Sequence, residues 1–157
     1  MRAGLREEVQ RYLGQHQVMT LASQGEEGVW AAAVFYTNEG FAFYFLSSPS
    51  SRHGRNLAAN PRAAATIHAD YADWREIKGV QMEGKVCLLA GKEEAEARGL
   101  YGAKFPIVAN AGQAPASIIK ALARVRWYRF VPERLYFIDN SAGFGQREEI
   151  ELRTGGA

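Results

Sequence analysis

The feature that most constrains the fold is a series of short strand-like segments separated by turn signals. The first three segments cover residues 18–23, 29–37 and 41–47, and the stretches Gly25-Glu-Glu-Gly28 and Asn38-Glu-Gly40 separate them. Glycine and asparagine tolerate the positive backbone φ angles that tight hairpin turns require. We therefore predict that the sheet begins as an antiparallel β-meander.

The remainder of the chain adds further strands and several peripheral helices. Strands are predicted at 63–69, 79–89, 127–131 and 134–139, with Pro132-Glu133 separating the last two. Helices are predicted at 51–59, 92–101 and 116–123, and at the start of the chain, where apolar residues recur at helical spacing (Leu5, Val9, Tyr12, Leu13). A closed or nearly closed antiparallel β-barrel accommodates this pattern most economically, because closure hides the sheet edges. We predict one mainly-β domain spanning residues 1–157, since this length is too short for two independent cores.

Composition excludes several classes of protein. Hydrophobic residues make up 47% and charged residues 23%, as in ordinary globular domains, and the net charge of +2 gives no basis for a nucleic-acid partner. Apolar runs such as Trp30 to Tyr36 are far shorter than the roughly 20 residues of a membrane helix. The single Cys87 cannot form an internal disulfide, and the first residues lack the apolar stretch of a secretory signal. We expect a cytoplasmic protein without membrane partners.

One motif is a false match. The stretch Gly79-Val-Gln-Met-Glu-Gly84-Lys85 matches the start of a phosphate-binding P-loop. However, Val86 stands where a P-loop needs Ser or Thr, and the stretch has the pattern of a strand instead of a glycine-rich turn. We predict a strand there and no P-loop.

Metal binding and nucleophilic catalysis have little support. The histidines are widely spaced and no paired-cysteine or His-Glu-x-x-His spacing occurs (His16, His53, His68). No serine lies in a Gly-x-Ser-x-Gly elbow, and we expect the lone Cys87 to be a buried core thiol. We predict no metal site.

The segment from Phe45 to Asn56 combines groups that bind phosphate. A strand ends in hydroxyl residues, and a helix then begins beside Ser51, Arg52 and His53. Free backbone N–H groups at a helix N-terminus and a guanidinium bind phosphate well, although an N-capped helix with a solvated basic face fits the same residues equally well. Some of the many aromatic residues could enclose a flat ring, while most would pack in the barrel core (Trp30, Tyr36, Tyr44, Trp74, Trp127, Tyr128, Phe144). A phosphate pocket beside an apolar cleft suits flavin mononucleotide (FMN).

These residues also carry a family resemblance. The run 45–61, followed by Ala63-Ala-Ala-Thr-Ile67 and Gly79-Val-Gln-Met-Glu-Gly84, resembles the pyridoxamine 5′-phosphate oxidase-like, FMN-binding split-barrel superfamily. In that family a strand ends in aromatic-Tyr-Thr, a Ser-Arg-Lys triplet follows, Asn-Pro closes the short helix, and a later strand carries Gln-Val-x-x-x-Gly. The resemblance covers residues 18–89, and residues 127–138 show a weaker similarity. Within the superfamily, the sequence is most similar to an uncharacterised bacterial branch.

The resemblance implies an antiparallel split β-barrel that forms a homodimer and holds FMN at the subunit interface. Ser47 takes the place of the family threonine. Ser51, Arg52 and His53 take the places of the Ser-Arg-Lys triplet and would hold the phosphate and ribityl chain.

Other positions would address the flavin ring. Gln81 lies two residues away from the position of the family glutamine that contacts the isoalloxazine ring. A displacement of two residues keeps a side chain on the same face of a strand. Trp127 and Phe144 of the partner subunit are the residues expected to cover the ring.

Departures from the family pattern bear on the reaction. The oxidase carries an Arg-x-His near its C-terminus, where this chain reads Phe144-Gly-Gln-Arg147-Glu-Glu, and Ile138 stands where the oxidase has tryptophan. The pattern predicts an FMN-dependent oxidoreductase that uses a small-molecule electron donor and acceptor but does not oxidise vitamin B6. The alternatives are a barrel that binds deazaflavin F420 or haem, with His68 as the candidate axial ligand, and a non-catalytic flavin sensor, flavin store or partner-binding barrel.

Overall fold

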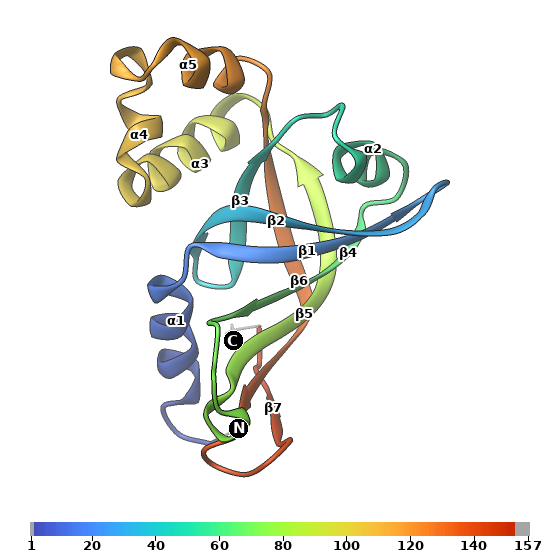
Figure 1. Ribbon diagram of the computed structural model, residues 1–157, viewed down its shortest axis with the longest axis vertical. Helices are drawn as coiled ribbons and strands as arrows, with labels where there is room; N and C mark the ends of the chain where they lie inside the picture. Colours follow the sequence, from blue (N-terminus) through green and yellow to red (C-terminus); the bar gives the residue numbers. More distant parts are fainter. Residues whose placement is uncertain (1, 153–157) are drawn as a thin grey trace, which may run out of the picture.

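Six antiparallel strands close into a barrel in the computed structural model, which describes residues 2–152 (Figure 1). The sheet order is β3-β2-β1-β4-β5-β6-β7, and an additional pairing of β3 with β6 closes the barrel. Closure removes the free edges of the six strands, and this arrangement confirms the predicted mainly-β split barrel. The strands are β1 (Val18–Gly25), β2 (Gly28–Glu39), β3 (Ala42–Ser47), β4 (Arg62–His68), β5 (Lys78–Leu88), β6 (Arg126–Asp139) and β7 (Arg147–Glu149).

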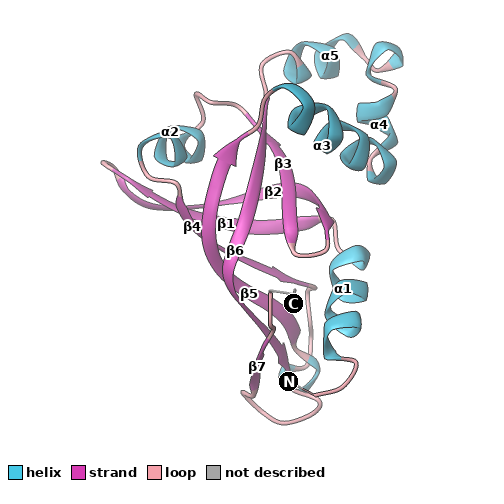
Figure 2. Ribbon diagram, turned by 180° about the vertical axis from the view of Figure 1, so that it is seen from behind, coloured by secondary structure: helices cyan, strands magenta, loops and turns pink. Residues whose placement is uncertain are grey.

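The helices all lie outside the barrel (Figure 2). Helix α2 packs beside the β1–β2 hairpin, whereas α3, α4 and α5 form a separate group at the same end of the molecule. No helix of residues 2–152 is long and apolar enough to cross a membrane. The helical segments are α1 (Leu5–Gln15), α2 (Arg52–Ala59), η1 (Trp74–Glu76), α3 (Gly91–Lys104), α4 (Pro106–Ala109), η2 (Ala111–Gln113) and α5 (Ala116–Leu122).

Two of the predicted turns lie where expected. Strand β1 pairs with β2 as far as Gly25 opposite Gly28, and Gly28 has a φ of 93°. Gly40, between β2 and β3, has a φ of 57°. Glycine occupies both positive-φ positions because it has no Cβ to clash with the backbone there.

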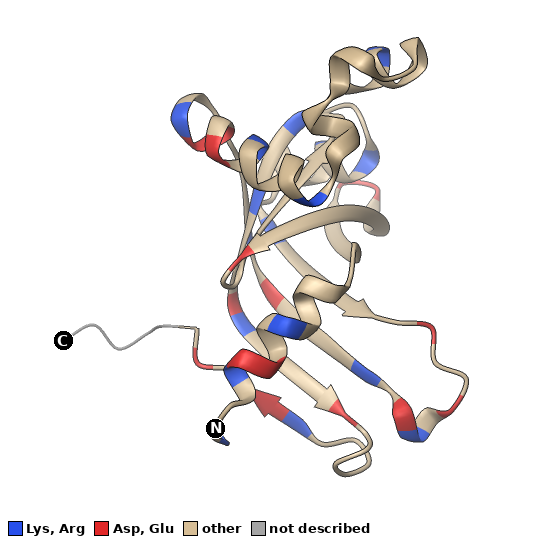
Figure 3. Cartoon of the chain, turned by 90° about the vertical axis from the view of Figure 1, so that its left-hand side faces the viewer, with Lys and Arg blue, Asp and Glu red and all other residues tan. Residues whose placement is uncertain are grey.

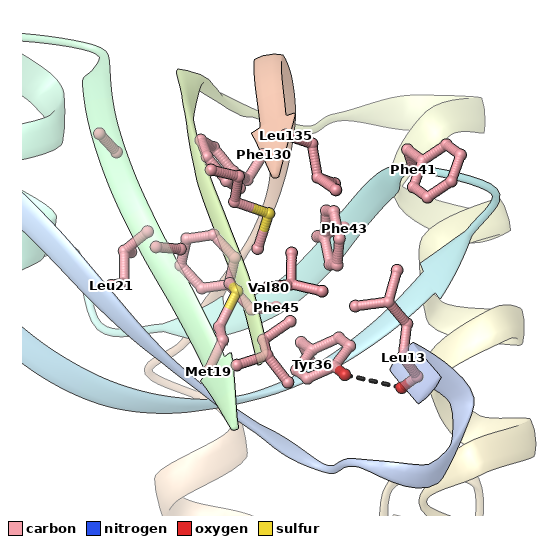
Figure 4. Close-up of a cluster of buried hydrophobic side chains, with 14 of the residues drawn as sticks. Leu13, Met19, Leu21, Tyr36, Phe41, Phe43, Phe45, Val80, Phe130 and Leu135 are labelled. Carbon is pink, nitrogen blue, oxygen red and sulfur yellow. Dashed lines mark hydrogen bonds between the residues drawn. The ribbon is translucent and has the colours of Figure 1, made fainter. Parts of the chain in front are cut away.

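The barrel interior is filled by aromatic and aliphatic side chains (Figure 4). Strand β1 alternates strictly, so Met19 and Leu21 point inward. The hydroxyl of Tyr36 donates to the carbonyl oxygen of Leu13 at 2.7 Å, which ties the end of α1 to the core. All four apolar positions predicted for the first helix are buried in the same core (Leu5, Val9, Tyr12, Leu13).

The prediction of two closing strands, 127–131 and 134–139, was wrong. The structure has one continuous strand, β6, with a β-bulge: Glu83 pairs with Arg134, but the next residue, Gly84, pairs with Pro132. Proline cannot donate to a ladder and is tolerated at a bulge, so Pro132 does not end the strand.

The strand prediction for residues 79–89 is confirmed by β5. The expectation that Cys87 is buried was wrong, because Cys87 is exposed. Side chains alternate along β5, and since Val86 points into the core, its neighbour Cys87 must point outward.

Candidate functional site

The N-terminus of α2 is built around a serine cap. The Ser51 hydroxyl oxygen accepts from the backbone N–H of Gly54 at 3.1 Å and donates to the carbonyl of Ser48 at 2.7 Å. A side chain on Gly54 would overlap the Ser48 carbonyl oxygen, so the loop can fold tightly over the first turn only because residue 54 is glycine. The capping interpretation of Ser51 therefore holds in this chain, and the hydroxyl is already engaged.

Ser47 and His53 form a pair next to this cap. Ser47 is the last residue of β3 and is buried, and its hydroxyl forms a hydrogen bond with Nε2 of His53. Burial lowers the pKa of His53 below its ordinary value, which favours the neutral imidazole. The positive charge in the first turns of α2 therefore comes from Arg52 and Arg55.

Arg52 connects α2 to the tip of the β1–β2 hairpin. Its Nη2 donates to the carbonyl oxygen of Glu27 at 2.7 Å, and its guanidinium lies 4.5 Å from the centre of the Trp30 ring. The Glu27 carboxylate lies 3.9 Å from Nε of Arg52 and 3.1 Å from Nη2 of Arg55. Nε of Arg52 is buried and has no hydrogen-bond partner among the described residues. Two guanidiniums thus share one carboxylate, which leaves net positive charge beside the helix N-terminus.

The remaining three predicted site residues lie elsewhere in the chain. Gln81 is exposed on the outer face of β5, opposite Thr66. Trp127 is only 3% exposed and packs against Tyr101 of α3 at a ring distance of 5.4 Å. Phe144 is 72% exposed and belongs to the turn between β6 and β7. Figure 1 shows this turn at the end of the molecule away from α2. One chain therefore brings together Ser47, Ser51, Arg52 and His53 but not the ring-facing residues.

Glu27 was not predicted for this site, and Trp30 was predicted only as one of several aromatic residues that could enclose a ring. Glu27 belongs to a predicted turn and Trp30 to a strand, and both contact Arg52 only because the hairpin extends over α2. Their separation from Arg52 by more than 20 residues leaves no local signal, apart from the opposite charges of Glu27 and Arg52.

Charge is distributed without a dominant sign elsewhere. Lys and Arg (blue) and Asp and Glu (red) are interspersed over the helices, strands and turns in Figure 3. Within residues 2–152, no cluster of three or more His, Cys, Asp or Glu side chains is arranged to hold a metal ion. The candidate site is therefore a local arrangement around α2.

The depressed pKa of His53 predicts a pH-dependent loss of stability. The unfolded chain takes up a proton on this histidine as the pH falls below about 6.5, whereas the folded chain resists protonation until a lower pH. The free energy of unfolding should therefore fall between about pH 7.5 and about pH 5.5, and fall less in His53→Gln. Urea unfolding at the two pH values measures both differences, and equal losses in the two proteins would contradict the prediction.

The family model described as pyridoxamine 5′-phosphate oxidase matches residues 5–139. The chain belongs to this family. Among the curated proteins, the UPF0306 protein plu4501 of Photorhabdus laumondii is 32% identical over 141 residues, which is 88% of this chain and 90% of the relative. Membership in the pyridoxamine 5′-phosphate oxidase family agrees with the resemblance carried by residues 45–61.

Solved structures share the fold of this pyridoxamine 5′-phosphate oxidase family member. A haem-binding protein from Mycobacterium smegmatis is 25% identical with a TM-score of 0.74, and the match covers 97% of this chain and 60% of that one. HutZ, the haem storage protein of Vibrio cholerae, is 18% identical with a TM-score of 0.68, and the match covers 86% and 94% of the two chains. The family fold is therefore found in proteins described as binding or storing haem.

Proposed function

We propose that this protein binds FMN, with the flavin phosphate at the N-terminus of α2, and that it is an FMN-dependent oxidoreductase. The observation that carries the proposal is the buried Nε of Arg52, which lacks a hydrogen-bond partner among the described residues and lies beside the first turn of a helix. The first N–H groups of a helix have no partner within the helix and attract anions. A phosphate there would accept from the N–H groups of the first turn that Ser51 leaves free, and from Arg52 once its guanidinium turns away from Glu27.

The other groups at the site fit a phosphate with one adjustment. The hydroxyls of Ser48 and Ser50 hydrogen-bond to each other at 2.8 Å at the surface and are available to a ligand. Glu27 opposes an anion, but its side chain is 61% exposed at a hairpin tip and can turn away into water. Ser47 and the neutral imidazole of His53 would then position the loop through their hydrogen bond instead of contacting the phosphate.

We propose that a second copy of the chain completes the site. Phe144 belongs to the turn between β6 and β7, and this turn is far from α2 in Figure 1, so within one chain Phe144 cannot cover a ring bound at α2. The outer faces of β1 and β2 expose large apolar side chains, at Val18, Val29 and Phe35. Such a surface is typical of an interface between subunits. Bound FMN would supply two-electron chemistry, and the protein would supply binding and orientation.

Haem is the second candidate, because the similar folds include proteins described as binding or storing haem. A haem would need an axial ligand, and the histidines differ in availability. Nε2 of His53 is engaged with Ser47, whereas His68 is exposed on the outer face of β4. The arginine and helix N-terminus at α2 suit a phosphate ester better than an iron porphyrin, so FMN remains the proposal.

The visible absorption spectrum of the purified protein, before and after addition of FMN and desalting, tests this proposal. We expect the two visible bands of oxidised flavin to be retained with the protein. A Soret band would show that the protein binds haem, and the proposal of FMN would then be wrong. A colourless protein that does not retain FMN would refute flavin binding and direct the search to F420. Oxidation of a reduced nicotinamide by the FMN-loaded protein would then separate an enzyme from a flavin store.

A further inference from the structure

A second cavity lies between α2 and the adjacent ends of β5 and β6, and it borders the α2 N-terminal site at Pro49 and Gly54. Its volume is about 300 Å³. Leu57, Val86 and Tyr128 form a buried floor, and Ala58, Leu88 and Arg126 form an exposed rim. A mostly apolar cavity with few polar groups is typical of a small-molecule site.

Arg126 gives this cavity a positive charge. No carboxylate of the described residues lies within 4.0 Å of its guanidinium, whereas Arg129 on the same strand is 3.5 Å from Glu93. An arginine at an apolar rim without an internal counter-ion is suited to bind an anion from solution.

Tyr128 adds a second polar group, at the floor. A tyrosine hydroxyl is protonated at neutral pH and can donate a hydrogen bond, and burial raises the pKa of this one further. That hydroxyl donates to no other residue of the described chain. The ring is held in place by a stacked contact with Phe45, with centroids 5.2 Å apart.

We propose that this cavity binds a small organic carboxylate with an apolar body, about the size of benzoate. The carboxylate would pair with the planar guanidinium of Arg126, and the apolar body would displace water from Leu57 and Val86. A phosphate ester suits the cavity less well, because one guanidinium and one hydroxyl cannot satisfy a dianion in an apolar lining. The ligand class therefore differs from that proposed for the α2 N-terminus.

The test is a titration of the full chain with benzoate, followed by the backbone amide signals of Gly54 and Ala58 in ¹H–¹⁵N NMR spectra. Both residues line the cavity, so we expect their signals to shift. Arg126→Gln should weaken benzoate binding by at least about tenfold. Benzamide, which has the same shape without the charge, should be affected little by this variant.

Two further variants sharpen the result. Arg124→Gln removes the same charge from an exposed residue outside the cavity and should leave benzoate binding unchanged. Ala58→Phe fills the cavity from an exposed position on α2 and should abolish binding while the chain stays folded. Absent shifts at Gly54 and Ala58, or equal affinity in Arg126→Gln, would overturn the proposal. Arg126 and Ala58 are not among the residues proposed to hold the flavin phosphate, so the response of these two variants to benzoate is separate from the outcome of the FMN test.

Discussion

Gly84→Ala is expected to lower the free energy of unfolding by about 3 kcal/mol, the upper end of the usual cost of added volume in a tightly packed site, because the neighbours cannot move. A Cβ at this position would overlap the carbonyl oxygen of Val131 and lie 2.7 Å from Cα of Pro132. Both neighbours are backbone atoms of the β6 bulge, which cannot rotate away as a side chain would. Denaturant unfolding followed by circular dichroism measures the loss.

Gly99→Ala is the matched control. Gly99 is exposed in the interior of α3, and nothing lies within 4 Å of an added Cβ. Alanine in a helix interior is favoured over glycine by about 1 kcal/mol, so this variant should be slightly more stable. If Gly84→Ala unfolds at the same denaturant concentration as the native protein, the close approach at the bulge does not limit the fold.

Arg52→Ala is expected to weaken FMN binding by about 1–3 kcal/mol, a factor of about 5–150 in Kd, because a charge-assisted hydrogen bond to phosphate is lost. Within the α2 site, Nε of Arg52 is a buried donor that has no hydrogen-bond partner among the described residues. Its loss also releases the Glu27 carbonyl and exposes the face of Trp30. Quenching of flavin fluorescence on binding measures the affinity.

Arg75→Ala separates a local effect from a general loss of positive charge. Arg75 pairs with Asp73 in the η1 segment, away from α2, and the variant removes the same charge. Its affinity for FMN should equal that of the native protein. Unchanged affinity in Arg52→Ala would remove Arg52 from the phosphate site, and equal losses in both variants would indicate only a long-range electrostatic effect.

Local sequence determined much of the fold. The hairpin turns, the first helix and the capped α2 depend on residues close together in the chain, such as Gly28, Gly40 and Ser51. Alternation of apolar and polar residues determined the faces of β1. For the same reason the phosphate-binding candidates were recognisable, because Ser51, Arg52 and His53 are consecutive residues at the start of one helix.

Only the tertiary structure decided where distant residues meet. Pro132 interrupts a strand by local rules, but pairing with Gly84 turns the interruption into a bulge. Trp127 is buried because α3 folds over it, and Phe144 lies far from α2 because β6 runs the length of the barrel. Arg52 meets Glu27 and Trp30 through the extension of one hairpin over a helix. Each contact depends on strand register and barrel closure, which many non-local pairings set together. The residues that are adjacent in the sequence therefore do not indicate these contacts.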